Sequence, residues 1–478
     1  MASKQGFKTL VAPNIFDAYV NPNLLLYLVA SNLLSASTWE FAEKIRARVA
    51  NANGGGARPI RRSIEEIQKV LDRSFRHLHV TQVAELYGEL DLAAERARLG
   101  PACVDLALGQ ILSTFEARIR SGAIPAAGLQ PAIDRMAASR FPAYSYGNID
   151  LIRAKRTLLG SSHASVRGVT SCVDETAIFA ALAMTLQKGS VANVIALSSP
   201  SHTSAFGWTS EGEPWWFYGK NRIYFADGWR TAVSQAQEGG AQEVFDACLG
   251  DLNRITSVAG TFDLETGQTS LPDAHIDEIA TQMDAFFGVR LRQLDAALSR
   301  PRLSCAEDPL ADCLRELLGA PSLDAAEEIL AAADDEASQG VLYAYRSLLV
   351  KDLHPYLEAA REQPKCRQLG LILSSPADAL SVIASMDGAA SIFGSRDRIA
   401  MPDETLLFRA GTDRDKALLL HVLLEHLAPR AGMSGAVETA FGATRSFVRI
   451  GECLFDAGAG KPVSETSEPI LFRFGGEL

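Results

Sequence analysis

Hydrophobic and polar positions follow two different periods along this chain, and the period changes several times. Residues 1–140 carry apolar side chains at helical spacing. In 63–75, for example, Ser63 is a predicted N-cap and Glu66 follows three residues later. The segments 80–100 and 104–122 have the same spacing and end in glycine. The composition shifts to aromatic and turn residues near 140–148, so we expect a boundary there.

The segment 168–235 has a different pattern. One apolar helix, expected to end before Gly189, is followed by short runs of β-forming residues. A helix followed by a meander of strands is typical of an α+β fold. The predicted strands are 191–197, 203–208, 214–219 and 222–227.

The remainder of the chain shows the same succession again. Residues 240–400 are mainly helical in pattern, most clearly at 323–350, and a helix at 413–427 precedes further strands at 436–441, 445–450, 452–458 and 470–474. We therefore predict an α+β chain in four regions. A helix-plus-antiparallel-sheet core is embedded in largely helical regions, and a second core follows: 1–140 helical, 141–240 first core, 241–395 helical, 396–478 second core.

Composition narrows the class of protein. The chain has 478 residues, 47% of them hydrophobic, and a formal net charge of −11, which argues against nucleic-acid binding by bulk electrostatics. The longest early apolar run, 24–30, is far shorter than a membrane span, and no signal-peptide core precedes it. Seven cysteines without a CxxC pair favour a reducing, cytoplasmic location over a disulfide framework or a zinc site. His77 and His79 lack a third ligand, so we predict no metal and no cofactor.

Cys172 precedes a run of good helix formers. A lone cysteine is most often a small buried apolar residue. At a helix start, however, unpaired backbone N–H groups and the helix dipole favour the thiolate, which is the reactive form. The residues that follow Cys172 decide between these interpretations.

Two polar residues after Cys172 complete a pattern that thiol catalysis requires. His202 stands immediately before one predicted strand, and Asp227 ends another. A thiolate attacks an acyl carbon, an imidazole shuttles the proton, and a third group orients the imidazole. Adjacent antiparallel strands can place histidine and aspartate side by side. Taken singly, His202 is a surface or core histidine, and Asp227 is a turn residue before Gly228.

The order and context of these residues resemble the transglutaminase-like superfamily, which has a papain-like core. The matching residues are Cys172 in "TSCVDETA", His202 in "SHTSAFGW" and Asp227 in "YFADGW", within 168–235. Thr203 stands where the family commonly has tryptophan. The resemblance implies an acyl-enzyme thioester on Cys172, with His202 as acid and base and Asp227 orienting it. The acyl donor would be a peptide, an amide or a carrier-bound thioester, and the acceptor either water or an amine.

Four of the five tryptophans fall within 208–229. They either pack in a core or line a groove for the acyl substrate, and we take Trp208 and Trp216 as the candidates for substrate binding. The alternative to an enzyme is a helical scaffold that carries an inactive core and binds a protein partner. The sequence leaves the substrate, the acceptor and the oligomeric state open.

The second predicted core aligns with the first as an internal repeat, although any two amphipathic helices followed by strands align to some degree. Threonine is a poor nucleophile without an adjacent base, and arginine stays protonated, so we expect this second core to be degenerate and non-catalytic. The residues placed opposite each other are Cys172 and Thr412, Asp174 and Arg414, Ala177 and Ala417, His202 and Arg445, and Asp227 and Asp456.

Overall fold

The chain is described here from a computed structural model. The residues that it describes are 22–52, 59–77, 148–150, 168–170, 172–187, 194–199, 202–219, 222–239, 257–259, 273–289, 309–361, 363–388, 393 and 395–475. The predicted helices at 80–100 and 104–122 lie outside these residues. The described part combines helices with antiparallel sheets, which confirms the α+β prediction.

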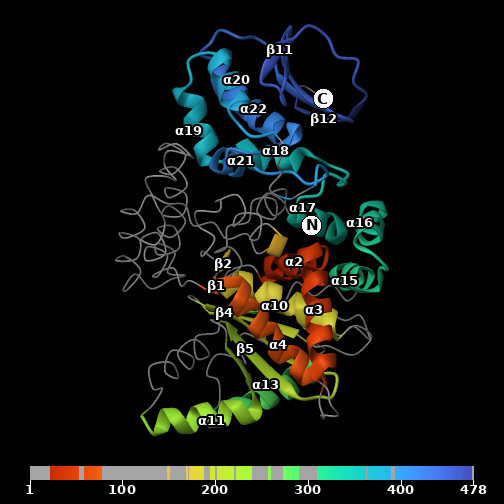
Figure 1. The fold of residues 1–478 in the computed structure, drawn as a ribbon, viewed down its shortest axis with the longest axis vertical. Helices are drawn as coiled ribbons and strands as arrows, with labels where there is room; N and C mark the ends of the chain where they lie inside the picture. Colours follow the sequence, from red (N-terminus) through yellow and green to blue (C-terminus); the bar gives the residue numbers. More distant parts are fainter. Residues whose placement is uncertain are drawn as a thin grey trace.

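The first unit is built on a five-stranded sheet (Figure 1). Its strand order is β6-β5-β4-β3-β7, and every neighbouring pair is antiparallel. Consecutive strands pair as a meander, and the last strand returns beside the first. The strands are β3 (Val194–Ser199), β4 (His202–Trp208), β5 (Pro214–Gly219), β6 (Arg222–Phe225) and β7 (Ser257–Ala259).

One helix, α10 (Cys172–Leu186), lies against this sheet and is buried along almost its whole length. Its Phe179 ring stacks on Phe217 of β5 at 4.0 Å, and Phe179 also contacts Trp215. The N-terminal helices pack on the other side of α10, so the helix is enclosed on all sides and its sequence is apolar all round. These helices are α2 (Pro22–Leu33), α3 (Ala36–Ala52) and α4 (Pro59–Ser74).

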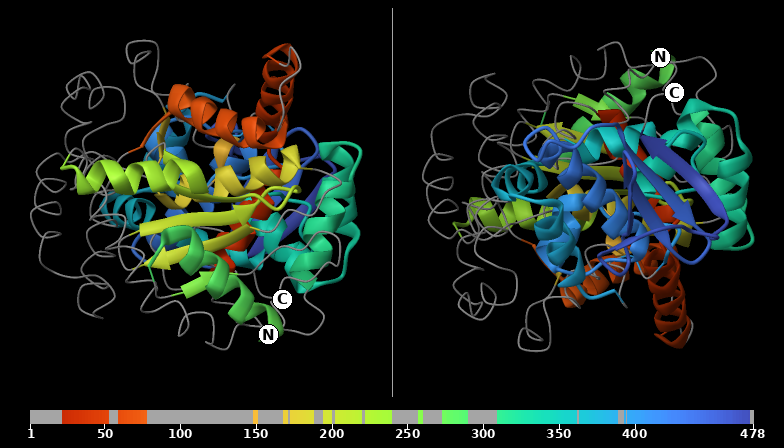
Figure 2. Two further views of the ribbon diagram at one scale, coloured as in Figure 1. Left: turned by 90° about the horizontal axis from the view of Figure 1, so that it is seen from below. Right: turned by 90° about the horizontal axis from the view of Figure 1, so that it is seen from above.

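The opposite face of the sheet is also covered. Side chains alternate along β5, so Trp216 and Tyr218 point away from α10 into a second, aromatic cluster. Two helices close this cluster, α11 (Ala226–Gln237) and α13 (Asp273–Phe287), and Figure 2 shows them over the sheet from below. Phe287 of α13 packs edge-on against Trp216 and Trp229.

The second unit repeats this arrangement. Helix α22 (Asp413–Leu427) lies against a sheet of order β11-β10-β9-β8-β12, with consecutive strands antiparallel and the last strand beside the first. The two orders match strand for strand, and the view from above in Figure 2 shows this sheet with its helices. The strands are β8 (Val437–Gly442), β9 (Ser446–Ile450), β10 (Cys453–Asp456), β11 (Lys461–Val463) and β12 (Ile470–Gly475).

Helices join the two units and surround α22. Helix α17 contacts α2 of the first unit, and a buried bidentate ion pair ties it to α21: Arg346 donates to Glu404 at 3.1 and 3.2 Å. The helices are α15 (Pro309–Gly319), α16 (Leu323–Ala332), α17 (Glu336–Tyr345), α18 (His354–Arg361), α19 (Pro364–Ile372), α20 (Pro376–Ala384) and α21 (Pro402–Phe408).

One local prediction needs correction, and another is refined. Ser63 is not an N-cap: α4 begins at Pro59, and the Ser63 hydroxyl donates to the Pro59 carbonyl inside the helix. The segment 323–350 is helical as predicted and contains two helices, because Asp335 caps a new helix and accepts a hydrogen bond from the amide of Ser338. No helix in the described part of the chain is long and apolar enough to cross a membrane.

Candidate active site

Cys172 is the first residue of α10, as the sequence predicts, and 6% of its surface is exposed. Its neighbour on the chain, β2 (Gly168–Thr170), pairs in parallel with β1 (Phe75–His77). The far end of the helix is held by Arg46, which donates to the Thr185 carbonyl at 2.6 Å. The helix is therefore fixed at both ends, and its first turn presents the thiol together with backbone N–H groups.

His202 begins β4, and the first turns of α10 pack beside it. The hydroxyl of Thr176 donates to the Thr203 carbonyl at 3.1 Å, which joins α10 to the residue next to His202. On the other side, Ser199 of β3 donates to the His202 carbonyl at 3.2 Å. The structure thus brings the start of α10 and the start of β4 to the same end of the sheet, as Cys172 and His202 require.

The imidazole of His202 is oriented by a backbone group. Its Nε2 is hydrogen-bonded to the carbonyl oxygen of Tyr218 in β5. A carbonyl can only accept, so Nε2 carries the proton, and in the neutral ring Nδ1 is the nitrogen that can take up a proton. Tyr218 lies in β5 between Phe217 and Gly219, where the register with β6 shifts.

A buried carboxylate adjoins this imidazole. Glu175, three residues after Cys172, is fully buried and accepts a hydrogen bond from the Thr170 hydroxyl at 2.8 Å. Gly219 lies between Glu175 and His202: a Cβ added there would lie 3.6 Å from Glu175 Oε2 and 3.6 Å from His202 Cε1. Gly219 has φ +88°, a conformation that favours glycine and allows the chain to turn beside the ring.

Asp227 does not lie beside His202, contrary to the prediction. It stands in the first turn of α11, not on a strand. In the pairing of β5 with β6, Gly219 faces Arg222 and Trp215 faces Phe225. Because the Trp215 end of β5 pairs with the Trp208 end of β4, β6 runs from the His202 end of the sheet toward the Trp208 end. Asp227 follows β6 and is therefore separated from His202 by about the length of β4, roughly 20 Å at 3.4 Å per residue.

At that far end Asp227 has another partner. Arg61 of α4 donates to both of its carboxylate oxygens, at 2.9 and 3.0 Å, and these hydrogen bonds lower the pKa of Asp227. The side chain is 66% exposed. Asp227 therefore belongs to a surface ion pair that links α4 to α11, and the apolar spacing of Trp229, Val233 and Ala236 is the sequence pattern that predicts this helix.

The two tryptophans predicted to bind substrate do not border the candidate site. Trp216 is completely buried in the aromatic cluster on the face away from α10, where its indole N–H donates to Ser204 at 3.2 Å. Trp208 ends β4, at the opposite end of the strand from His202, and packs against the same cluster. Both residues are therefore part of the packing between the sheet and its outer helices, and the prediction is corrected.

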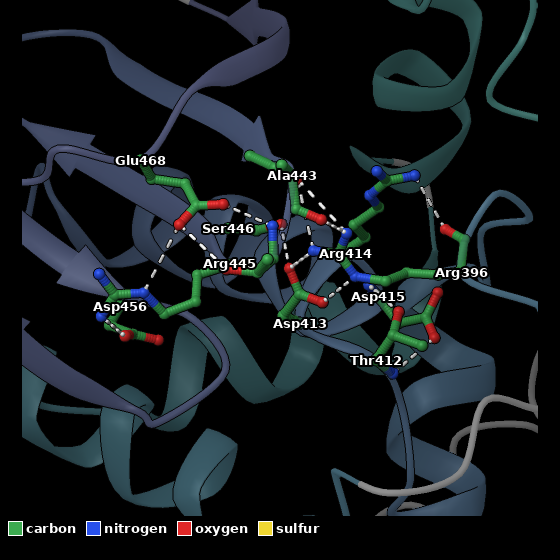
Figure 3. A network of polar contacts seen from close by, with 12 residues as sticks. Arg396, Thr412, Asp413, Arg414, Asp415, Ala443, Arg445, Ser446, Asp456 and Glu468 are labelled. Carbon is green, nitrogen blue, oxygen red and sulfur yellow. Dashed lines mark hydrogen bonds and ion pairs between the residues drawn. The ribbon is translucent and has the colours of Figure 1, made fainter.

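The second unit fills the equivalent place with paired charges (Figure 3). Thr412 caps α22 and Asp413 is its first residue, so these two stand where Cys172 begins α10. Arg445 immediately precedes β9, the counterpart of β4, and Ser446 is its first residue. The Ser446 hydroxyl donates to Asp413 Oδ2 at 2.5 Å.

Asp456 ends β10, which is the counterpart of β5. Its structural equivalent is therefore the end of β5 near Gly219, not Asp227, and the predicted alignment is wrong at this position. Arg445 pairs with Asp456 at 3.3 Å. The end of β10 thus carries a carboxylate that forms an ion pair with an arginine.

Arg396 closes this network from the segment before α21. It binds Asp413 through Nε at 2.8 Å and Nη2 at 2.5 Å, and it donates to the carbonyls of Gly442 and Ala443 (Figure 3). The Asp413 side chain is 13% exposed. A bidentate pair of this kind is among the stronger polar contacts in proteins, so the place is filled rather than open.

Sequence reasoning missed Glu175, Thr170 and the Tyr218 carbonyl. Glu175 could have been noticed, because it and Asp174 are the charged residues of a mainly apolar helix, and Glu175 lies one turn after Cys172. A backbone carbonyl carries no side-chain pattern, so Tyr218 could not. Among the described residues no group of histidine, cysteine and acidic side chains is arranged to hold a metal ion. No protein-family model, no curated protein and no solved structure matches this chain.

Proposed function

We propose that the first unit is a cysteine-dependent acyl-transfer centre in which Cys172 is the nucleophile and His202 the acid and base. The observation that carries this proposal is the hydrogen bond from His202 to the Tyr218 carbonyl. Because Nε2 carries the proton, Nδ1 is the nitrogen through which this buried imidazole accepts a proton, at the end of the sheet where α10 begins with Cys172. The resemblance of "TSCVDETA" and "SHTSAFGW" to a papain-like, transglutaminase-like core supports the same chemistry.

The reaction follows from these groups. The proton of Cys172 passes to His202 Nδ1, and the thiolate attacks the carbonyl carbon of an amide or thioester. The N–H of Cys172 stabilises the oxyanion, and His202 returns the proton to the departing amine or thiol. An acyl thioester on Cys172 results. Water or an amine then loses a proton to His202, attacks the thioester and releases the free thiol, so either an acid or an amide is formed.

An activated acetyl ester tests the nucleophile without knowledge of the substrate. We expect p-nitrophenyl acetate to acetylate Cys172 in the intact protein, with peptide mass spectrometry assigning the site. The variant Cys172→Ala should lose this label. The matched control is Cys453→Ala, which removes an exposed thiol of the second unit and should leave acetylation of Cys172 intact. Acetylation of Cys453 but not of Cys172 in the wild-type protein would contradict the proposal.

A binding scaffold is the second candidate, and the burial of the site favours it. Cys172 and His202 are only 6% and 4% exposed. Side chains alternate along β4, so His202 lies on the same face of the strand as Ser204 and Phe206. Those two residues face away from α10. The pH dependence of iodoacetamide labelling separates the two candidates. A scaffold predicts that Cys172 reacts more slowly than the exposed Cys453 at every pH, whereas a thiolate–imidazolium pair predicts faster reaction of Cys172 near pH 6.

A further inference from the structure

Glu175 is a titratable group that the proposed chemistry leaves without a role, although it is fully buried next to the site. It lies three residues after Cys172, one turn along the same face of α10. One carboxylate oxygen, Oε1, accepts the hydrogen bond of Thr170. Burying a carboxylate is costly unless it is paired or hydrogen-bonded, so the groups around Glu175 indicate its role.

The other oxygen of Glu175 and the ring of His202 lie on either side of the same glycine. The position of a Cβ on Gly219 is 3.6 Å from Glu175 Oε2, and 3.6 and 3.9 Å from Cε1 and Nε2 of His202. The carboxylate and the imidazole therefore border the same point at the end of β5. In the described part of the chain, the titratable groups on elements packed against His202 are Cys172, Asp174 and Glu175 of α10 and Tyr218 of β5.

We propose that Glu175 is the positioning residue of this site, whose carboxylate stabilises the protonated imidazole of His202. The inference rests on the proposed function. The Tyr218 carbonyl sets the direction of Nε2–H but contributes only a dipole, whereas a full negative charge next to the ring favours its charged form more strongly. Glu175 takes the role that the sequence assigned to Asp227. It reaches the ring from the helix of the nucleophile, not from a neighbouring strand.

A histidine titration tests this directly. In full-length protein carrying Cys172→Ala, which removes the coupled thiol, NMR of the His202 ring gives the pH midpoint of its protonation, with His202→Gln assigning the resonance. Adding Glu175→Gln should lower this midpoint by about one pH unit or more, since the amide keeps the shape and removes the charge. Thr170→Val should shift it in the same direction by less. Asp227→Asn, the same change of carboxylate to amide at the far end of the sheet, should leave it unchanged.

The outcomes separate the inference from the proposed function. An unchanged His202 midpoint in Glu175→Gln overturns the role of Glu175. Should Glu175→Gln fail to fold, Thr170→Val decides, and an unchanged midpoint there overturns the role as well. Iodoacetamide labelling of the protein with Cys172 present tests the function itself. If Cys172 reacts faster than Cys453 near pH 6 while the Glu175→Gln midpoint is unchanged, the function stands and only the inference fails.

Discussion

The two units have the same strand order but differ in how many faces of the sheet are covered. The first sheet lies between α10 and the pair α11 and α13, and its strands read as nearly continuous apolar runs, such as "PWWFYG". The second sheet packs on α22, while Glu438, Arg449 and Arg473 on its other face are exposed. Its strands alternate instead, as in "VETAFG". Burial on two faces removes the alternation that burial on one face imposes.

The units also differ at the start of the central helix. In the first unit the helix begins with a thiol, and the neighbouring strand β4 begins with an imidazole that a backbone carbonyl orients. In the second, Asp413 begins the helix and is held by Arg396 and Ser446. The same topology therefore carries different residues at the start of its central helix in the two units. In the second unit an ion-paired carboxylate stabilises the structure at this place, whereas in the first unit the same place holds the thiol that the proposed function uses as its nucleophile.

The largest expected effect separates the two helix starts by reactivity. Cys172→Ala should reduce acetylation by p-nitrophenyl acetate at the site at least about 10³-fold, because no other group there can form the thioester. Thr412→Ala, at the matching position of α22, should leave acetylation of Cys172 nearly unchanged. Time courses by intact-mass spectrometry measure both rates. Comparable losses in two folded variants would end the distinction between a reactive unit and a degenerate one.

The next effect concerns the stability of the second unit. Arg396→Met leaves the carboxylate of Asp413 without its cation, and we expect a loss of about 2–3 kcal/mol in the free energy of unfolding. Arg449→Met, which changes an exposed arginine of the same sheet, should cost under about 0.5 kcal/mol. Urea titrations followed by circular dichroism give both values. Equal effects of the two variants would show that the network around Asp413 contributes no more than a surface charge.

Acid should remove one stabilising interaction from α22 of the second unit. Burial opposes ionisation of Glu425 in α22, but hydrogen bonds from Arg361 and His421 outweigh it and lower the pKa of Glu425 to about 2. A depressed carboxyl pKa stabilises the fold above about pH 4.5, and this stabilisation is lost as the pH falls toward 2. Allowing for solvent screening, we expect a loss of about 1–2 kcal/mol between pH 6 and pH 3. Helix α10 has no ionisable residue in its last turn.

The tryptophans make this difference measurable. All five lie in the first unit and its N-terminal helices, so their fluorescence reports on that part of the chain. Hydrogen exchange of peptides from β8 to β12 reports on the second unit. Between pH 6 and pH 3, exchange there should rise more in the wild type than in Glu425→Gln, with unchanged fluorescence in both, because only the wild type loses the ionised Glu425. Glu438→Gln, at an exposed position of β8, should respond as the wild type does.

A smaller effect comes from the cap of α22. Thr412 accepts a hydrogen bond from the Asp415 amide at 3.3 Å, and Asp415 accepts one from the Thr412 amide at 2.8 Å, which forms a capping box. Thr412→Ala should cost about 1 kcal/mol of unfolding free energy. Thr412→Ser keeps the hydroxyl and should cost only a few tenths of that. A Thr412→Ala protein as stable as the wild type would show that this helix start does not depend on its cap.

The smallest expected effect is at Asp227. Its carboxylate is 66% exposed, so Asp227→Asn should change the free energy of unfolding by under about 1 kcal/mol. It should leave iodoacetamide labelling of Cys172 unchanged, because the residue lies at the other end of the sheet. Parallel denaturation and labelling assays check both statements. A marked loss of Cys172 reactivity in this variant would restore the original assignment of Asp227 as the orienting residue.

Much of the local structure could be predicted from the sequence. The helix over 413–427 agrees with α22 at both ends, and the strand at 214–219 agrees with β5. Cys172 and His202 also stand at the starts of the predicted helix and strand. These positions depend on apolar spacing, caps and turn residues, which act between neighbours along the chain.

Which side chains meet was decided only by the tertiary structure. The register of β6 on β5 carries Asp227 away from His202, and no local pattern encodes that direction. Burial of a second sheet face places Trp216 in a core, and the pairing of β4 with β5 brings His202 to the Tyr218 carbonyl that orients it. The sequence by itself therefore determined the elements and the nucleophile candidate. Strand pairing and packing over long separations determined the partners, because those contacts join residues that are distant along the chain.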